Sequence, residues 1–83
     1  MKKTFLELLS EQHDWPTDYL FKFVVPSAKV AEFTDLLDLK TFESKESSGG
    51  KYVSLTFSWK MNTPEEVIKV YQKAAQIEGL ISL

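Results

Sequence analysis

The clearest pattern in the chain is an alternation of apolar and polar residues from Lys51 to Met61, which reads KYVSLTFSWKM. Strict alternation is typical of a β-strand with one face buried and the other wet or shared. Ser47-Ser48-Gly49-Gly50 comes just before this strand. Glycine supplies the positive φ that tight hairpins need, so a hairpin turn is predicted at Ser47–Gly50. The core side of the strand is predicted to be Val53, Leu55, Phe57, Trp59 and Met61.

Three further strands are predicted. Residues Tyr19–Val25 are aromatic and β-branched, and both of their faces are mostly apolar, which suits a central strand. Lys22 is the exception, and its side chain must reach water or a partner. Residues 40–46 (KTFESKE) form a weak strand whose charges suit a sheet edge. Leu80–Leu83 is predicted as a last short strand.

Helical periodicity predicts three helices. The first is short and amphipathic and covers Thr4–Gln12, where it either closes an open edge of the core or binds a partner. The second runs to about Asp38, and the Ser27 hydroxyl is predicted to cap it. The third starts with Thr63 as its N-cap, followed by proline and a capping-box glutamate. Gly79 is predicted to end this helix in the left-handed cap position.

The element order is one helix followed by β-α-β-β-α-β, which predicts an α+β fold of the ferredoxin-like type. Right-handed crossovers put the first and third strands in the middle of a four-stranded antiparallel sheet, with two helices on one face. Residues 1–14 are expected to form an N-terminal helical extension, and residues 15–83 a single domain.

Composition narrows the function classes. Eighty-three residues with 43% hydrophobic content make one small domain, whose stability we expect to be on the order of 5 kcal/mol. The chain has no cysteine, which excludes disulfides and thiol chemistry. Glu7 interrupts the N-terminal apolar run, so no secretory signal is predicted, and no segment is apolar enough to span a membrane. We therefore expect a cytoplasmic protein without membrane contact.

The charged residues argue against catalysis and nucleic-acid binding. The net charge is −2 and every cation is a lysine, so the bidentate arginine fork that suits phosphate is missing. His13 is the one histidine, and in its polar loop it is interpreted as a surface residue without a catalytic partner. The pairs Asp35/Asp38 and Glu65/Glu66 are interpreted as a solvated helix face and a helix N-terminus. No catalytic residue, metal site or cofactor is predicted.

The SSGGK turn has a superficial likeness to a phosphate-binding loop. It lacks the full pattern G-x-x-x-x-G-K-[ST] and joins strand to strand, so a flexible hairpin is favoured. The alternative is a mobile arm that closes on a partner. Acylphosphatases share the ferredoxin-like fold and use an arginine and an asparagine. The chain has no arginine, and its one asparagine, Asn62, follows the third strand. The sequence therefore argues against an acylphosphatase.

The uncovered sheet face is the best candidate for function. One tyrosine and one or two lysines make a poor RNA platform, because stacking aromatics carry that role in ferredoxin-like domains. The mixture of apolar and small polar side chains suits a protein partner or a second copy of the chain. The residues of this predicted face are Leu20, Lys22, Val24, Tyr52, Ser54, Thr56 and Ser58.

The motifs W-P-T-D-Y-x-F-K-F-V, S-S-G-G-K-Y-V-S-L-T and E-x-V-x-x-x-Y resemble the YbeD-like family of small bacterial proteins of unknown function. The resemblance runs from about Trp15 to Leu83. It implies a ferredoxin-like fold similar to ACT domains, which are regulatory modules that often bind amino acids. ACT-type sites use a glycine near the first strand–helix junction, whereas this chain has Val25-Pro26-Ser27 there, so no ligand residue carries over. The resemblance is sharpest at Pro16, Lys22, Ser48, Gly50, Tyr52, Ser54 and Tyr71.

The sequence thus favours a non-enzymatic regulatory or protein-binding module that uses the open sheet face and the Ser47–Gly50 hairpin. The alternative is an ACT-like sensor of an amino acid or similar metabolite, although no residue pattern supports a small-molecule ligand. The candidate contact residues are Lys22, Ser48, Gly50, Tyr52 and Ser54.

Overall fold

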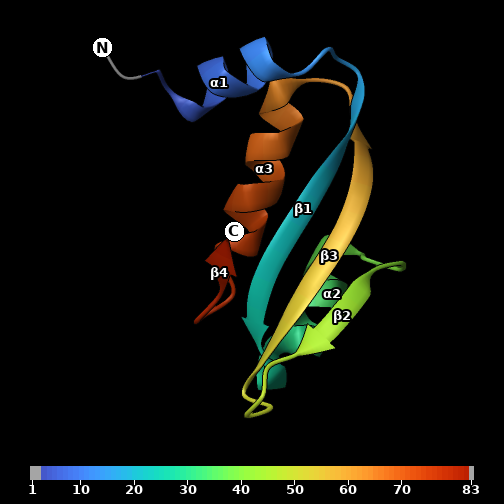
Figure 1. Cartoon of the computed structure of the whole chain (residues 1–83), viewed down its shortest axis with the longest axis vertical. Helices are drawn as coiled ribbons and strands as arrows, with labels where there is room; N and C mark the ends of the chain where they lie inside the picture. The colour runs from blue at the N-terminus through green and yellow to red at the C-terminus, as the bar shows by residue number, and fades with distance from the viewer. Residues whose placement is uncertain (1–2, 83) are drawn as a thin grey trace.

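The computed structural model describes residues 3–82. It contains three α-helices, one short 3-10 helix and four strands, arranged as an α+β sandwich (Figure 1). The elements in chain order are α1 (Phe5–Gln12), β1 (Thr17–Pro26), η1 (Ser27–Lys29), α2 (Val30–Leu37), β2 (Glu43–Glu46), β3 (Tyr52–Met61), α3 (Pro64–Ala74) and β4 (Ile81–Ser82). Leu83, the last residue of the predicted fourth strand, lies outside the described residues.

The four strands form one antiparallel sheet in the order β2-β3-β1-β4. The two strands with the strongest sequence patterns, β1 and β3, are central and pair along ten positions, from Thr17 opposite Met61 to Pro26 opposite Tyr52. The edges are β2 and β4. This confirms the predicted α+β class, and the strand order is that of a ferredoxin-like fold.

The edge strands cover only part of the central pair. Strand β2 pairs with residues 53–56 of β3, and β4 pairs with β1 only at Phe23 and Val24. The sheet is therefore four strands wide near the β2–β3 turn, and a two-stranded ribbon where β1 begins and β3 ends (Figure 1).

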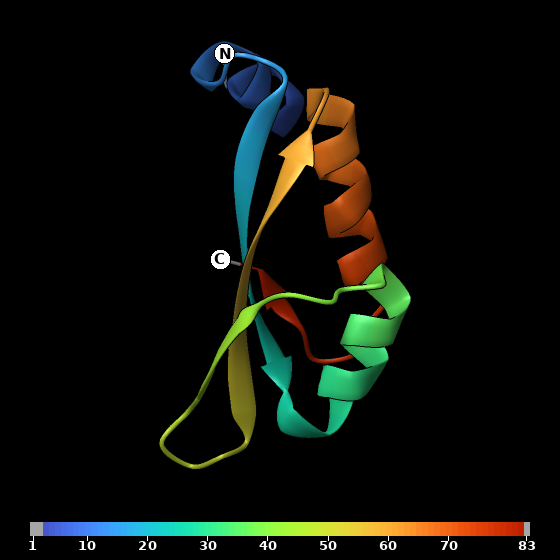
Figure 2. The ribbon, with the colours of Figure 1, turned by 90° about the vertical axis from the view of Figure 1, so that its right-hand side faces the viewer.

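Helices α2 and α3 cover one face of the sheet and leave the other without a helix (Figure 2). The odd-numbered residues of β1 and β3 point toward these helices, as the alternation predicts, and their aromatic rings pack against one another. Trp59 is only half-buried, at the margin of this layer. The largest fully buried side chains are Phe21, Phe23, Phe33, Leu55, Val25 and Val67.

Helix α1 lies across the end of the sheet where β1 begins (Figures 1 and 2). The Thr4 hydroxyl accepts a hydrogen bond from the Glu7 N–H and caps the helix, and Leu9 is buried. The indole of Trp15 donates to the Leu9 carbonyl at 3.3 Å. The Phe5 ring meets the Tyr71 ring of α3 edge-on, so α1 closes the end of the core.

The predicted start of α3 is confirmed. The Glu66 N–H donates to the Thr63 hydroxyl at 3.4 Å, and Pro64 is the first helical residue. The Glu66 carboxylate reaches back to the N–H of Asn62 at 3.0 Å, one residue earlier than a standard capping box.

Two predicted cap residues have other roles. Ser27 makes no side-chain cap: its hydroxyl donates to the Gly50 carbonyl across the β1–β3 end of the sheet, and η1 leads into α2. Gly79 does not end α3, because the helix ends at Ala74 and turns follow it. Gly79 still has a left-handed backbone, with φ of +82°, and a Cβ there would lie 2.9 Å from Cγ of Pro26. The positive φ together with close contact with β1, and not helix capping, explains this glycine.

Candidate functional site

The sheet face without a helix is called the open face below. It is formed by the even-numbered residues of β1 and β3 together with Glu43, Lys45 and Ile81 of the edge strands. Three large apolar side chains are exposed on it: Leu20 (65%), Ile81 (50%) and Tyr52 (41%). Apolar surface gathered on one face of a small domain marks a binding surface more often than isolated apolar residues do.

The strand register arranges the open face in cross-strand rows. One row runs over all four strands as Lys45, Ser54, Val24 and Ile81. The next row holds Glu43, Thr56 and Lys22. The first row thus runs from a charged group on β2 to an apolar group on β4, whereas the second has a charged group at each end.

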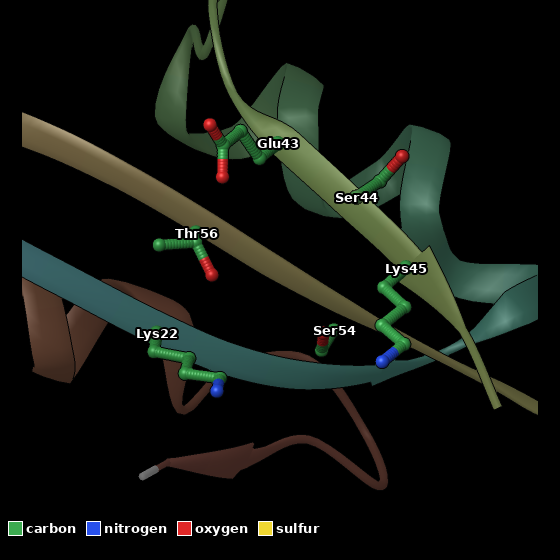
Figure 3. Close-up of a pocket in the computed structure, with 6 residues that line it drawn as sticks. All are labelled: Lys22, Glu43, Ser44, Lys45, Ser54 and Thr56. Atoms are coloured by element: carbon green, nitrogen blue, oxygen red, sulfur yellow. The ribbon is translucent and has the colours of Figure 1, made fainter.

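A shallow polar hollow of about 190 Å³ occupies the β2 side of these rows. Figure 3 shows the Lys22 and Lys45 side chains both extending toward Ser54, which lies between their ammonium groups. Glu43 lies beside Thr56 at the other end of the hollow. Its lining residues are Lys22, Glu43, Ser44, Lys45, Ser54 and Thr56.

A second hollow of about 220 Å³ adjoins the first and is mainly apolar. Lys45 and Ser54 belong to both hollows, so the two form one continuous surface. Val24 and Tyr52 supply the apolar wall of the second hollow. Its lining residues are Val24, Lys45, Glu46, Ser47, Tyr52 and Ser54.

The two lysines of the polar hollow have no ion-pair partner among residues 3–82. The salt bridges described for that range involve other cations, namely Lys3, Lys29 and Lys40. The hydroxyls of Ser54 and Thr56 likewise make no side-chain hydrogen bond to a described residue. The floor and walls of the hollow thus offer unpaired donors to a ligand. Nor do the described histidine and acidic side chains cluster in a way that could hold a metal ion.

The β2–β3 turn is held by hydrogen bonds of its own. The Ser47 N–H donates to the Tyr52 carbonyl at 2.8 Å, and the Tyr52 N–H returns a bond to the Ser47 hydroxyl at 3.2 Å. The Gly50 N–H donates to the Ser47 carbonyl at 2.9 Å. Of the two turn glycines only Gly50 has a positive φ, of +69°.

The five predicted contact residues are thus divided between two places. Lys22, Tyr52 and Ser54 line the joined hollows of the open face. Ser48 and Gly50 lie in the adjoining turn and line neither hollow. Sequence reasoning missed Glu43 and Lys45, because residues 40–46 indicated only a charged edge strand and the register of that strand against β3 was unknown.

The other titratable candidates lie away from the open face. His13 is half-buried, not a free surface residue, because its ring packs edge-on against Trp15 and Tyr19, with centroids 5.8 and 5.5 Å away. Tyr71 lies on the helix side of the sheet. Burial, and after it the neighbouring Tyr19, raises the pKa of the Tyr71 hydroxyl above its ordinary value. Neither residue contributes to the two hollows.

The helices described for this chain all fall short of the length and apolar character that crossing a membrane demands.

Comparison with known proteins identifies the family to which the chain belongs. No curated protein matches the chain, and no solved structure matches it. The family described as "Protein of unknown function (DUF493)" matches residues 10–82, which include every strand and all the residues of both hollows. The chain therefore belongs to this family of proteins of unknown function.

Proposed function

We propose that the protein is a non-enzymatic regulatory module that binds another protein through the open face and the adjoining Ser47–Gly50 turn. The observation that supports this most directly is the exposure of Leu20, Tyr52 and Ile81 on a sheet face that no helix covers. Tyr52 lines the second hollow, and Ile81 is opposite Val24, which lines it too. Leu20 is two residues from Lys22 on the same face of β1. The resemblance to the YbeD-like family of small bacterial proteins implies a regulatory role of this kind, and we propose that the protein acts in the cytoplasm.

The shape of the hollows favours a protein over a small metabolite. Small-molecule sites are clefts or cavities that bury most of the ligand. The two joined hollows are shallow and lie open on a sheet face. Protein partners spread contact over a larger area and need no deep cavity.

The proposal that the chain is not an enzyme rests on the placement of its one histidine. General-base catalysis needs a base within hydrogen-bond reach of the group that it deprotonates. His13 packs beside Tyr19, which is opposite Trp59, near the two-stranded end of the sheet. The polar hollow lies at the other end, so the imidazole does not serve it.

Partner capture with matched variants tests the proposal. The tagged full chain is immobilised, and native lysate is applied to wild type, Lys22→Glu, Tyr52→Ala and Lys69→Glu. Lys69 is an exposed α3 residue, so its charge reversal is the control for Lys22. We expect one bound protein that both open-face variants lose and the Lys69 variant keeps. Capture that is equal in all four samples contradicts the proposal, as does a chain that captures nothing and sediments as a monomer.

The second candidate is a sensor of an amino acid or similar metabolite, in keeping with the ACT-like resemblance. The convergence of Lys22 and Lys45 on Ser54 favours it, because ammonium and hydroxyl groups bind carboxylates. A thermal-shift screen against amino acids and related metabolites separates the candidates. A rise in melting temperature that Lys22→Gln abolishes supports the sensor, and a flat screen contradicts it.

A further inference from the structure

The open face joins a cationic site to an apolar one, and this juxtaposition indicates the chemistry of the partner. Resting on the proposed function, we propose that the open face binds an extended segment of a partner protein in which a carboxylate side chain and an apolar side chain lie two residues apart. The carboxylate occupies the polar hollow between Lys22 and Lys45, and the apolar side chain packs on Val24 and Tyr52.

The geometry of the two lysines suits one anion held between them. Lys22 is on β1 and Lys45 is on β2, with β3 between the two strands, so their backbones are about 10 Å apart across the sheet. They are also offset by two residues along the strands, because Lys22 is opposite Thr56 and Lys45 is opposite Ser54. Their side chains extend toward each other and end on either side of Ser54 (Figure 3). Like charges directed into the same space repel, and an anion between them removes this repulsion.

The hydroxyls below the lysines complete the site. Ser54 and Thr56 lie on β3 under the polar hollow, and neither hydroxyl makes a hydrogen bond to a described residue. A hydroxyl rotates to donate to whatever acceptor is near. The hollow therefore offers two ammonium groups and two neutral donors to one oxyanion.

The charge of Glu43 favours a carboxylate over a phosphate as the bound group. Glu43 lines the same hollow, opposite Thr56. Two lysines and one glutamate give a local charge of +1, which a carboxylate of charge −1 balances. A phosphate group, with a charge of about −1.5 to −2 at neutral pH, brings excess negative charge close to Glu43. The lysine point charges also lack the arginine fork that favours phosphate.

The spacing between the hollows sets the spacing of the recognised side chains. Ser54 and Tyr52 are two residues apart on the same face of β3. Side chains two residues apart in an extended segment lie on one face, about 7 Å from each other. An extended partner segment that follows the strand thus places its carboxylate over Ser54 and Thr56, and its apolar side chain over Tyr52 and Val24.

A peptide titration followed by amide NMR of the full chain tests the proposal. The probe is a capped heptapeptide of glycine, phenylalanine, serine, glutamate, serine, phenylalanine and glycine, which presents the motif in both chain directions. One control peptide replaces the glutamate by glutamine, and another replaces both phenylalanines by alanine. Sodium phosphate is titrated separately.

We expect the probe to shift the amides of Lys22, Val24, Lys45 and Ser54 and to bind more tightly than both control peptides. Lys22→Gln and Lys45→Gln each weaken binding by about two- to fivefold, as for an exposed charge pair. Glu43→Gln strengthens binding by a similar factor, and Lys69→Gln leaves it unchanged. Half-molar salt weakens binding because it screens exposed charges.

Three outcomes overturn the proposal: equal affinity for the glutamate and glutamine peptides, tighter binding of phosphate than of the probe, or no amide shift on the open face. None of these overturns the proposed function, which fails if Tyr52→Ala and Lys22→Glu leave partner capture intact, or if the chain captures nothing and sediments as a monomer. Loss of capture in those variants together with a silent titration shows that the face binds a protein of different chemistry.

Discussion

The hydroxyl of Ser27 donates a hydrogen bond of 2.6 Å to the carbonyl oxygen of Gly50. Beside it, the Ser27 N–H donates to the Lys51 carbonyl at 2.9 Å. These bonds join the residue that follows β1 to the turn between β2 and β3. The turn is therefore anchored to the centre of the sheet, which argues for a fixed edge of the apolar hollow and against a mobile arm that closes on a partner.

Removal of this hydroxyl should destabilise the anchored turn. We expect Ser27→Ala to lower the free energy of unfolding by about 0.5–1 kcal/mol, the usual net contribution of one hydrogen bond at an exposed site. Urea denaturation followed by circular dichroism measures the change. Ser48→Ala is the control, because the Ser48 side chain makes no hydrogen bond within the described residues, and its midpoint should equal that of wild type. A Ser27 variant as stable as the control contradicts the anchor.

The two turn glycines should respond differently to alanine. Gly50 has a φ of +69°, where a Cβ costs about 1 kcal/mol, so Gly50→Ala should lower the urea midpoint. Gly49 has no positive φ, and a Cβ there meets nothing within 4 Å. Gly49→Ala should therefore leave the midpoint unchanged or raise it slightly, because alanine restricts the unfolded chain. Equal losses from both substitutions would show that the turn adopts another backbone conformation.

The two faces of the central strands should separate folding from binding. Phe57 is 4% exposed and packs against Phe21 with ring centroids 5.3 Å apart. Phe57→Ala should cost about 3–5 kcal/mol, which unfolds much of the population of a domain this small. Lys22→Glu and Tyr52→Ala should shift the thermal midpoint little, since both side chains are exposed. An equal fall in the thermal midpoint of all three variants would contradict the assignment of the strand faces.

Tyr71 should make stability depend on pH in the alkaline range. Its pKa in the folded chain is raised above the ordinary value of 10.0, so the hydroxyl stays neutral after the same group in the unfolded chain ionises. The stabilisation from this shift is fully present below about pH 10 and is lost as pH rises further.

Comparison of Tyr71→Phe with wild type isolates this effect, because other groups that titrate in the same range are common to both. Urea denaturation at about pH 8 and about pH 11 should show a larger loss of stability in wild type than in the variant. Equal losses in the two proteins would mean that the folded chain does not hold the Tyr71 proton.

Most of the fold follows from local patterns in the sequence. The alternation in β3 and the apolar character of β1 marked these two as the strongest strands, because apolar side chains that face a core recur at every second residue of a strand. Both strands are central in the structure. Thr63 and Pro64 gave the start of α3 correctly for a similar reason, since a helix N-terminus is specified by neighbouring residues. Handedness then limited the strand order to a few arrangements.

The errors arose where a residue's partner is distant in the sequence. Ser27 carries a typical capping side chain, yet its hydroxyl bonds to Gly50, 23 residues later. Gly79 is a typical helix-ending residue, yet its close contact is with Pro26. The polar hollow was missed for the same reason: the approach of Lys45 to Lys22 depends on how β2 aligns with β3, and a short charged edge strand carries no hydrophobic pattern that would set its register.

The uneven width of the sheet determines where binding costs least entropy. The two hollows lie at the four-stranded end, where the β2 and β4 ladders and the anchored turn hold the backbone. A surface that is already ordered loses little conformational freedom when a ligand docks, so it is preorganised. The ordering cost of the complex then falls on the partner segment, and the affinity of this module should depend on how readily that segment becomes extended.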